Sequence, residues 1–446
     1  MNYRQVSKYL DDCLIFGIKP DLVRIKKILE LLRDPQTKVD FIHIVGTNGK
    51  TSTTKMVSAI LRSQGIRTGY HISPHIDSYT ERMWIDGRDL SEKKFTETFN
   101  EIYPVILEVN KMDPGGPVTQ FEIISAMAFK LAENENVEVM VLEAGMGGRW
   151  DATNIADSKV VGLTGVSLEH TEILGKTIRD ITLEKVEVIK ENVMVATASS
   201  NKEVLEILRD KAEKTGSGLF LYGKDFYIQK KINMGLNGWS FDIKGINETY
   251  KNLTLPLLGQ YQPLNLSLAI TLVELYLGTR GKKIDEEKLR KTISEIRVKG
   301  RLEIIRKNPI VILDAGHNPE GTENFVKDIS YYFSKKKKII IFAVLKDKDY
   351  ESMVERIIGI SDILILTSSL SARSLGVDQL EKVVKERIKF LKNKAFRPAR
   401  LYTVDTIENS IKFALKISTI NDIICITGSI TNLENIVCKY KIKPGG

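Results

Sequence analysis

The stretch Phe41-Ile-His-Ile-Val-Gly46-Thr-Asn-Gly-Lys50-Thr-Ser52 decides the fold of this chain. Its first five residues form an apolar run that predicts a buried strand. From Lys50 to Gln64, apolar side chains recur on one helical face, and Gly65 stands where a helix commonly ends. A strand followed by a glycine-rich turn and a helix is the context that a phosphate-binding loop requires.

The turn carries groups that suit a phosphate. Its glycines allow backbone N–H groups to close on phosphate oxygens, and the helix N-terminus adds a partial positive charge. Lys50 is expected to reach the β- and γ-phosphates, and a hydroxyl to ligate Mg²⁺. The strict pattern G-x-x-x-x-G-K-[ST] fails at its first glycine, where the chain has Ile44, so a purely structural turn is the alternative. We predict a nucleotide site at Gly46, Thr47, Asn48, Gly49, Lys50, Thr51 and Ser52.

Outward from this loop, apolar runs of strand length alternate with helical patterns, which predicts an α/β fold. Short alternating runs from Leu219 to Leu255 predict a small antiparallel β insert. Beyond residue 309, apolar runs separated by helical patterns predict a Rossmann-like parallel sheet. We expect a nucleotide-binding P-loop domain over residues 1–298 and a C-terminal α/β domain over residues 299–446. The runs of the second domain are Ile310–Leu313, Lys338–Val344, Ile363–Leu366, Arg400–Val404 and Ile423–Thr427.

The composition restricts the function without choosing it. Lys and Arg number 66 and Asp and Glu 57, and the net charge of +9 permits a nucleic-acid partner without requiring one. No basic helix with interleaved aromatic residues supports such a partner. Cys13, Cys425 and Cys438 are scattered, which argues against a disulfide framework. The N-terminus lacks an apolar signal segment and the apolar runs are far shorter than the ~20 residues that span a bilayer. We expect a cytoplasmic protein with no membrane partner.

A carboxylate follows another predicted core strand. Glu143 ends the apolar run that begins at Val137, and Ala-Gly-Met-Gly-Gly-Arg149-Trp-Asp151-Ala-Thr-Asn154 comes next. A carboxylate at the carboxyl end of a parallel strand is well placed to hold Mg²⁺ near bound phosphates. The alternative is a buried structural carboxylate.

Further motifs occur in a fixed order along the chain. Besides the two segments above, they are Ser73-Pro-His75, His170-Thr-Glu-Ile-Leu-Gly175, Glu184-Lys185, Gln260-Tyr-Gln-Pro-Leu-Asn265, Gly300-Arg301-Leu-Glu303 and Asp314-Ala-Gly-His317-Asn-Pro319. In order and spacing this set resembles the folylpolyglutamate synthase/dihydrofolate synthase family, the folate branch of the Mur ligase superfamily. The resemblance covers essentially the whole chain. It implies a Mur-ligase-like P-loop domain followed by a Rossmann-like ligase domain.

The resemblance implies an ATP-dependent amide ligase. In such enzymes the γ-phosphoryl group of ATP passes to a folate or dihydropteroate carboxylate, and the amine of L-glutamate attacks the resulting acyl phosphate. This chemistry needs positioning and charge neutralisation more than a covalent protein nucleophile. ATP, two Mg²⁺ ions and a monomeric state are implied as well.

The resemblance also assigns roles to single residues. The catalytic set is Lys50, Glu143, His170, Lys185 and His317. Lys185 matches the lysine that is carbamylated in this family, and the ordinary alternative is a helix lysine that pairs with Glu184. The magnesium ligands are Ser73, Glu143 and His170, and the further ATP-binding residues are Asn265, Arg301 and Asp314. The folate and glutamate side is Arg82, Thr119, Phe121, Glu122, Arg149, Asp151, Asn154 and His317.

Some positions depart from the family pattern and leave the acid substrate open. The loop has Gly-Lys-Thr-Ser where the folate branch usually has Gly-Lys-Gly-Ser, and Lys299 replaces a proline. Dihydropteroate, a reduced folate, or both are the leading substrates. The alternative in the same class is a Mur-like ligase that joins an amino acid to a muramyl or other acid. Outside that class stand a nucleic-acid-dependent NTPase and a non-catalytic nucleotide-binding protein.

Overall fold

The computed structural model describes residues 1–17, 19–369, 371–391, 399–433 and 436. Its chain forms two compact units. The first consists of Met1–Ile232, Ser240–Leu255 and Gln262–Ile296, and the second of Asn233–Trp239, Pro256–Tyr261 and the described residues from Arg297 on. Cys438 lies outside the described residues, whereas Cys13 and Cys425 are buried free thiols.

The first unit is built on a sheet that follows the predicted α/β pattern. Over its described residues the sheet has eight strands in the order β4-β3-β2-β5-β1-β6-β7-β8. The central strand β1 pairs in parallel with β5 and β6, which places Ile44 beside Glu143. The strands are β1 (Asp40–Val45), β2 (Thr68–His71), β3 (Met83–Ile85), β4 (Arg88–Asp89), β5 (Val139–Glu143), β6 (Ser158–Leu163), β7 (Met194–Thr197) and β8 (Gly218–Leu221).

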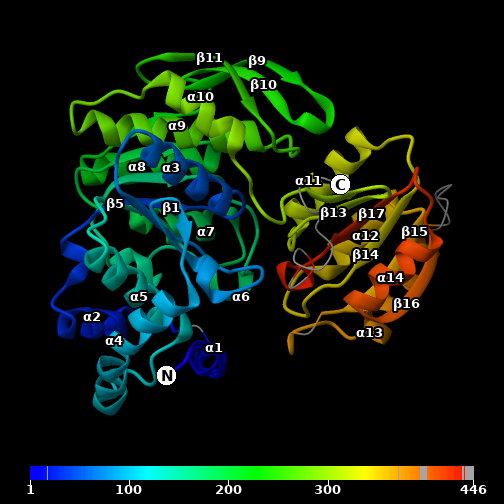
Figure 1. Ribbon diagram of the computed structural model, residues 1–446, viewed down its shortest axis with the longest axis horizontal. Coiled ribbons are helices and arrows are strands. Elements are labelled where there is room, and N and C mark those ends of the chain that lie inside the picture. Colours follow the sequence, from blue (N-terminus) through cyan, green and yellow to red (C-terminus); the bar gives the residue numbers. More distant parts are fainter. Residues whose placement is uncertain (18, 370, 392–398, 434–435, 437–446) are drawn as a thin grey trace. The chain divides into compact units, whose positions relative to one another are not determined.

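Helices cover both faces of this sheet (Figure 1). On one face Phe129 of α5 meets Phe41 of β1 edge to face, with ring centroids 5.5 Å apart. On the other face Leu272 of α9 packs closely against Gly162 of β6. The helices are α1 (Tyr3–Asp12), α2 (Val23–Leu31), α3 (Lys50–Ser63), α4 (Glu92–Met112), α5 (Gln120–Asn134), α6 (Thr171–Leu174), α7 (Ile178–Lys185), α8 (Lys202–Thr215), α9 (Gln262–Gly278) and α10 (Glu286–Glu295).

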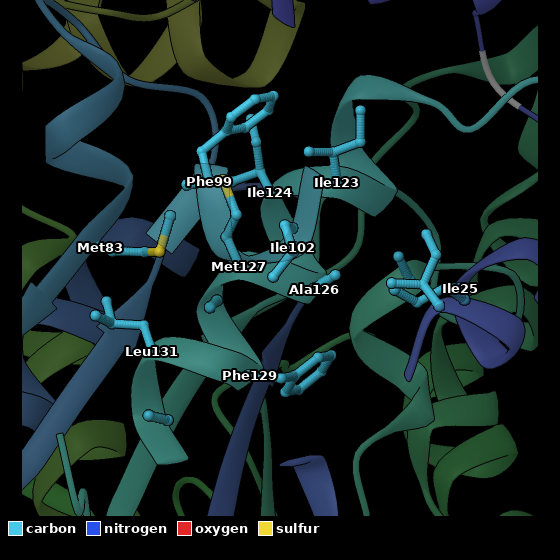
Figure 2. Packing of buried hydrophobic residues seen from close by; sticks show 14 of the residues in the cluster. Ile25, Met83, Phe99, Ile102, Ile123, Ile124, Ala126, Met127, Phe129 and Leu131 are labelled. Carbon is cyan, nitrogen blue, oxygen red and sulfur yellow. The ribbon is translucent and has the colours of Figure 1, made fainter. Parts of the chain in front are cut away.

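A large cluster of buried apolar side chains lies along α4 and α5. Figure 2 shows Phe99 and Ile102 of α4 packed among Ile124, Met127 and other apolar side chains of α5. The buried positions of α4 recur at three- and four-residue spacing, so one face of this helix is buried. Helix α5 is buried on nearly all sides, since every residue from Glu122 to Phe129 is buried. Helix α5 begins with a capping box in which Thr119 and Glu122 satisfy each other's backbone N–H groups.

The predicted insert starts later than expected. The run at Leu219 was predicted as its first strand, but it forms β8, which pairs in parallel with β7 in the main sheet. Helix α8 lies between these strands and provides the crossover that a parallel pair needs. The insert itself is a sheet of three strands in the described chain, ordered β11-β10-β9. These are β9 (Tyr227–Asn233), β10 (Trp239–Lys244) and β11 (Thr249–Leu255).

The second unit contains all five strands predicted for the C-terminal domain and one more. Over the described residues its six-stranded sheet has the order β12-β13-β17-β14-β15-β16. Strand β12 was missed, and it pairs antiparallel with β13 at the edge of an otherwise parallel sheet. The strands are β12 (Glu303–Lys307), β13 (Ile310–Leu313), β14 (Lys338–Phe342), β15 (Ile363–Ser368), β16 (Arg400–Thr406) and β17 (Ile423–Thr427). The helices are α11 (Pro319–Tyr332), α12 (Tyr350–Ile360), α13 (Val377–Leu391) and α14 (Ile407–Ile417).

Candidate active site

The loop between β1 and α3, predicted to bind phosphate, turns sharply at two glycines. Gly46 and Gly49 have φ angles of 145° and 89°, a region that side chains disfavour. A Cβ on Gly46 would lie 2.0 Å from Thr164 Oγ1, and one on Gly49 would lie 2.6 Å from Asn265 Oδ1. The loop is therefore held closely between the end of β6 and the start of α9, and only glycine fits at these two positions.

The two hydroxyls after Lys50 point to different neighbours. Thr51 Oγ1 donates a 2.9 Å hydrogen bond to Glu143 Oε1. Ser52 is buried, and its hydroxyl accepts a 3.4 Å hydrogen bond from Gln262 Nε2 of α9. Because β5 lies next to β1, the Glu143 carboxylate reaches the phosphate loop, as expected for a strand-end carboxylate. The structure thus groups Thr51, rather than Ser52, with Glu143.

Two lysines converge on the same loop. Lys50 Nζ donates to the carbonyl oxygens of Gly46 and Thr47 at 3.1 and 3.0 Å. Lys185 Nζ donates to the same Gly46 oxygen at 2.9 Å. Lys185 is buried, and burial together with the Lys50 charge lowers its pKa to about 7. The alternative pairing of Lys185 with Glu184 is not formed, because Glu184 accepts from Arg149 Nε at 3.0 Å.

The other expected metal ligands lie on loops of the first unit. Ser73 precedes a cis proline and lines a cavity of the first unit. His170 has a φ of 52° at the N-terminus of α6, with Nε2 3.9 Å from Glu169 Oε1. Within the described residues no three His, Cys, Asp or Glu side chains gather into a metal-binding group. A magnesium site here would depend on hydroxyl oxygens such as that of Thr51, which is hydrogen-bonded to Glu143.

A cavity of about 550 Å³ in the first unit contains much of the predicted substrate side. Ser73, Thr119, Phe121, Glu122 and Asp151 all line it. Further lining comes from the glycine-rich loop after β5, from the loop around Lys19 and from α6. The structure therefore brings together residues from five separate motifs of the sequence.

The charged groups in the cavity wall are already compensated. Glu122 accepts from Thr119 N at 2.8 Å and forms an ion pair with buried Arg24, with Nη2 3.1 Å from Oε1. Asp151 accepts from Met146 N at 2.8 Å and Thr153 N at 3.0 Å, and burial raises its pKa. Both carboxylates support the wall of the cavity through these hydrogen bonds.

The remaining substrate-side residues of the first unit do not line the cavity. Arg82 is buried, its Nε donates to His75 Nδ1 at 2.9 Å, and its guanidinium lies over the Tyr79 ring. Burial and the Arg82 charge lower the pKa of His75 to about 3, so this ring is a neutral acceptor. Arg149 pairs with Glu184 and Glu187. Asn154 Nδ2 donates to the Arg149 carbonyl at 3.2 Å.

Predicted nucleotide residues occur in both units. Asn265 lies on α9 beside the phosphate loop, and its Nδ2 donates to Gln262 Oε1 at 3.2 Å. In the second unit Asp314 follows β13, is buried, and accepts from Leu302 N and Gly316 N. Burial raises the pKa of Asp314. His317 Nδ1 donates to the Ala315 carbonyl at 3.0 Å.

Arg24 is a residue of this site that the sequence did not indicate. Its guanidinium is buried and joins Asp21, Glu122 and the Gly115 carbonyl at the cavity wall. Glu122 is 98 positions away along the chain, so no local sequence pattern could have predicted its ion pair with Arg24. The one available signal was an arginine in a segment that was not assigned to a helix from the sequence, although apolar residues recur in it at helical spacing, at Val23, Ile25, Ile28 and Leu29.

The fold and the site define a class: an α/β P-loop domain joined to a parallel-sheet domain, with a strand-end carboxylate at the phosphate loop. Residues 44–273 match the Mur ligase middle domain, and residues 300–430 match the Mur ligase, glutamate ligase domain. The chain belongs to the folylpolyglutamate synthase/dihydrofolate synthase family of Mur ligases, and it is an ATP-dependent ligase. This confirms the resemblance and the fold class inferred from the motifs.

Individual relatives match along nearly the whole chain. A dihydrofolate synthase/folylpolyglutamate synthase of Bacillus subtilis is 30% identical over 98% of this chain and 99% of its own. One of Mycobacterium tuberculosis is 31% identical over 89% of this chain and 82% of its own. A structure of the Mycobacterium tuberculosis folylpolyglutamate synthase complexed with ADP and AMPPCP has a TM-score of 0.90, 29% identity and 99% coverage of both chains. The Thermotoga maritima folylpolyglutamate synthase has a TM-score of 0.83 and 30% identity, with 98% and 96% coverage.

In the part of the chain that the structure describes, no helix is both long enough and apolar enough to cross a membrane.

Proposed function

We propose that this enzyme adds L-glutamate to the carboxylate of dihydropteroate, of a folate, or of both. The observation that carries the proposal is the cavity lined by Ser73, Thr119 and Phe121, in the same unit as the phosphate loop. The cavity's size suits a flat, drug-sized ring system. Relatives that carry both the dihydrofolate synthase and the folylpolyglutamate synthase names support either substrate.

The lining of the cavity favours an aromatic acid over a muramyl acid. A muramyl precursor brings a sugar and a diphosphate, which need uncommitted cations in the wall. Lys19, the one lysine or arginine among the described lining residues, donates to the Gly115 carbonyl at 3.2 Å. The faces of Phe121, Pro74, Met146 and Trp150 suit a planar ring instead.

The reaction proceeds through an acyl phosphate. The substrate carboxylate attacks the γ-phosphorus of ATP and ADP leaves; the amine of glutamate then attacks the acyl carbon, loses a proton and expels phosphate. The backbone N–H groups of the phosphate loop and Lys50 hold the phosphates and offset the charge that develops on them. Relatives solved with ADP and AMPPCP support this placement of the nucleotide. Asn265, Arg301, Asp314 and His317 are proposed to bind ATP or the incoming glutamate on their motif matches.

The oxygen donors at the phosphate loop fit magnesium. Thr51 and Glu143 lie in hydrogen-bond contact at the point where a hydroxyl and a carboxylate are needed, and Ser73 and His170 complete the proposed ligand set for two ions. Magnesium bound by these residues would neutralise phosphate charge.

Lys185 is proposed to be carbamylated. A carbamate forms from a neutral amine and CO₂, and a pKa of about 7 leaves a large fraction of this amine neutral near pH 7.5. Its side chain already reaches the Gly46 carbonyl beside the magnesium residues. A carbamate there would replace a second ammonium group with an anion able to ligate or orient a cation.

The test of the carbamate is Lys185→Ala. Ligation should fall at least about 100-fold and recover in part with a small carboxylic acid that fills the vacated space. Lys190→Ala, a surface lysine near the same helix end, serves as the matched control and should stay close to the unmodified rate. Unchanged activity of Lys185→Ala would remove the carbamate from the mechanism.

The domain boundaries and the oligomeric state are also proposals. We assign residues 1–298 to the ATPase domain and residues 299–446 to the ligase domain, and we propose a monomer that acts on small molecules alone. Sedimentation equilibrium should give a mass near the chain mass of 50.4 kDa at micromolar concentration.

A further inference from the structure

Trp150 differs from the other two tryptophans of the chain. Trp84 stacks on Tyr70 with ring centroids 5.3 Å apart, and Trp239 Nε1 donates to the Leu258 carbonyl at 3.0 Å. Trp150 is 48% exposed, and no aromatic ring of the described chain contacts it. A half-exposed tryptophan combines a large apolar face with a polar N–H, and this combination makes tryptophan common in binding contacts.

The backbone on each side of Trp150 is fixed. Arg149 N donates to the Glu184 carbonyl at 2.9 Å, and the Arg149 side chain pairs with Glu184 and Glu187. Asp151 accepts from two backbone N–H groups of its own loop. The indole is therefore presented from a rigid segment into the cavity that Trp150 lines, which lowers the entropic cost of using it as a contact.

Ile173 supplies a second exposed apolar side chain to the same cavity. It is 49% exposed and also lines the cavity, and the next residue, Leu174, packs against the loop that carries Trp150. A Cβ on Gly147 of that loop would lie 2.9 Å from Leu174 Cδ2. Two half-exposed apolar side chains in one cavity wall would both lose water contact when a flat ligand lies against them.

This part of the wall adjoins the reacting end of the site. Ile173 N donates to the His170 carbonyl at 2.9 Å. A Cβ on Gly148 would lie 2.9 Å from Lys185 Cα, so the Trp150 loop packs directly on the end of α7. Thr119 and Glu122 line the same cavity from the start of α5.

We propose that Trp150, with Ile173, forms the surface against which the group carrying the reacting carboxylate packs, and that it favours an aromatic carboxylic acid there. The proposal rests on the proposed function. In dihydropteroate the reacting carboxylate is attached to a benzoyl ring, which would lie on the indole. In a folate a flexible glutamyl residue stands between that ring and the reacting carboxylate. Trp150 is accordingly a specificity-determining residue that favours dihydropteroate over folates with a glutamate tail.

The experiment compares Trp150→Ala, Trp150→Phe and the control Tyr402→Ala, an exposed aromatic residue of β16 outside this cavity. Each purified protein is assayed for kcat and KM with dihydropteroate and with tetrahydrofolate, at saturating ATP, Mg²⁺ and glutamate. Trp150→Ala should raise the KM for dihydropteroate about tenfold, equivalent to about 1.4 kcal/mol. The KM for tetrahydrofolate should rise less than threefold, kcat should stay within twofold, and Trp150→Phe should restore most of the loss. Tyr402→Ala should match the unmodified protein.

The possible results distinguish a failure of the role proposed for Trp150 from a failure of the proposed function. An unmodified protein that turns over neither acid would overturn the proposed function and this inference together. If dihydropteroate is a substrate but its KM is the same in Trp150→Ala, only the role of Trp150 falls. Equal rises in KM for both acids and for ATP would show a structural effect and would equally overturn the specificity role.

Discussion

At the scale of single residues, the Gly46 carbonyl oxygen accepts hydrogen bonds from the amines of two lysines. Lys50 and Lys185 both donate to it, although Lys185 is 139 positions away along the chain. Burial and the neighbouring charge lower the pKa of Lys185 to about 7. A side chain with this pKa changes its protonation within the ordinary working range of an enzyme.

This pKa predicts how stability depends on pH. An unfolded chain keeps a lysine pKa of about 10.4, so between about pH 7 and pH 10 it binds a proton that the folded chain lacks. Stability contributed by Lys185 therefore rises with pH across that window, by about 1.4 kcal/mol per pH unit, and is lowest below pH 7. Lys185→Met removes the buried amine and should be more stable than the unmodified protein at pH 6.

Urea unfolding in CO₂-free buffer at pH 6 and pH 9 measures this difference. The advantage of Lys185→Met should shrink markedly at pH 9. An advantage that is the same at both pH values would mean that Lys185 does not titrate in this range.

Glu143 gives a second prediction at this scale. Its carboxylate accepts from Thr51 and is buried at the end of β5. Glu143→Ala should lower ligation at least about 100-fold, because the group proposed to hold magnesium at the phosphates is removed. The far-ultraviolet circular dichroism of the variant should match that of the unmodified protein. Full activity in Glu143→Ala would place the metal site elsewhere.

At the scale of elements, α2 and α5 are joined by a buried ion pair. Arg24 and Glu122 have side chains that are 0% and 6% exposed. Glu122 lines the substrate cavity, and Arg24 pairs with it. Removing one partner of a buried pair leaves the other charge uncompensated, which typically costs about 3–5 kcal/mol.

Arg24→Met should therefore lower the free energy of unfolding by about 3 kcal/mol. The double variant Arg24→Met/Glu122→Gln should recover most of that loss, because no charge is then left buried and the side-chain amide oxygen can still accept from Thr119 N. Lys27→Ala, which removes an exposed ion pair on the same helix, should change stability by less than about 1 kcal/mol. Denaturant titration of the four proteins measures these values. A double variant less stable than Arg24→Met would show that the pair stabilises the fold by itself.

The elements also show what the sequence pattern could predict. The strand before Gly46 and four of the five C-terminal runs were recognisable, because buried parallel strands are continuous apolar segments. The fifth run forms β16, a largely exposed strand at the sheet edge. Strand β12 was missed because its residues, Glu-Ile-Ile-Arg-Lys, alternate weakly at the sheet edge. Strand β8 was placed in the wrong sheet, because alternation alone does not say which neighbour a strand pairs with.

The site residues that could be predicted are those that belong to a local sequence pattern. The Gly46 to Lys50 loop and Glu143 at a strand end follow from local patterns that parallel pairing brings together. The contact of Lys185 with Gly46 and the pairing of Arg24 with Glu122 depend on tertiary packing, so no spacing announces them. The sequence likewise did not show that Asp151 and Glu122 would be held in the cavity wall by hydrogen bonds and an ion pair.

At the scale of the whole molecule, the net charge of +9 requires no polyanionic partner. Many of its cations are used in surface ion pairs such as Arg280 with Glu138 and Lys190 with Asp157. We predict that single-stranded and double-stranded DNA and RNA leave ATP turnover within twofold of the basal rate. Turnover should change little between 50 and 200 mM salt, in contrast to the steep dependence of a nucleic-acid-driven enzyme. Strong stimulation by any nucleic acid would contradict this assignment.

The central claim is that the enzyme joins glutamate to a pterin-containing acid. The most direct measurement incubates the purified protein with ATP, Mg²⁺ and L-glutamate, together with dihydropteroate, tetrahydrofolate or a UDP-muramyl acid in separate reactions, and identifies each product by mass. The account predicts a product heavier by one glutamyl residue, with one ADP and one phosphate released, from dihydropteroate or tetrahydrofolate and none from the muramyl acid. A glutamyl product from the muramyl acid alone would contradict it.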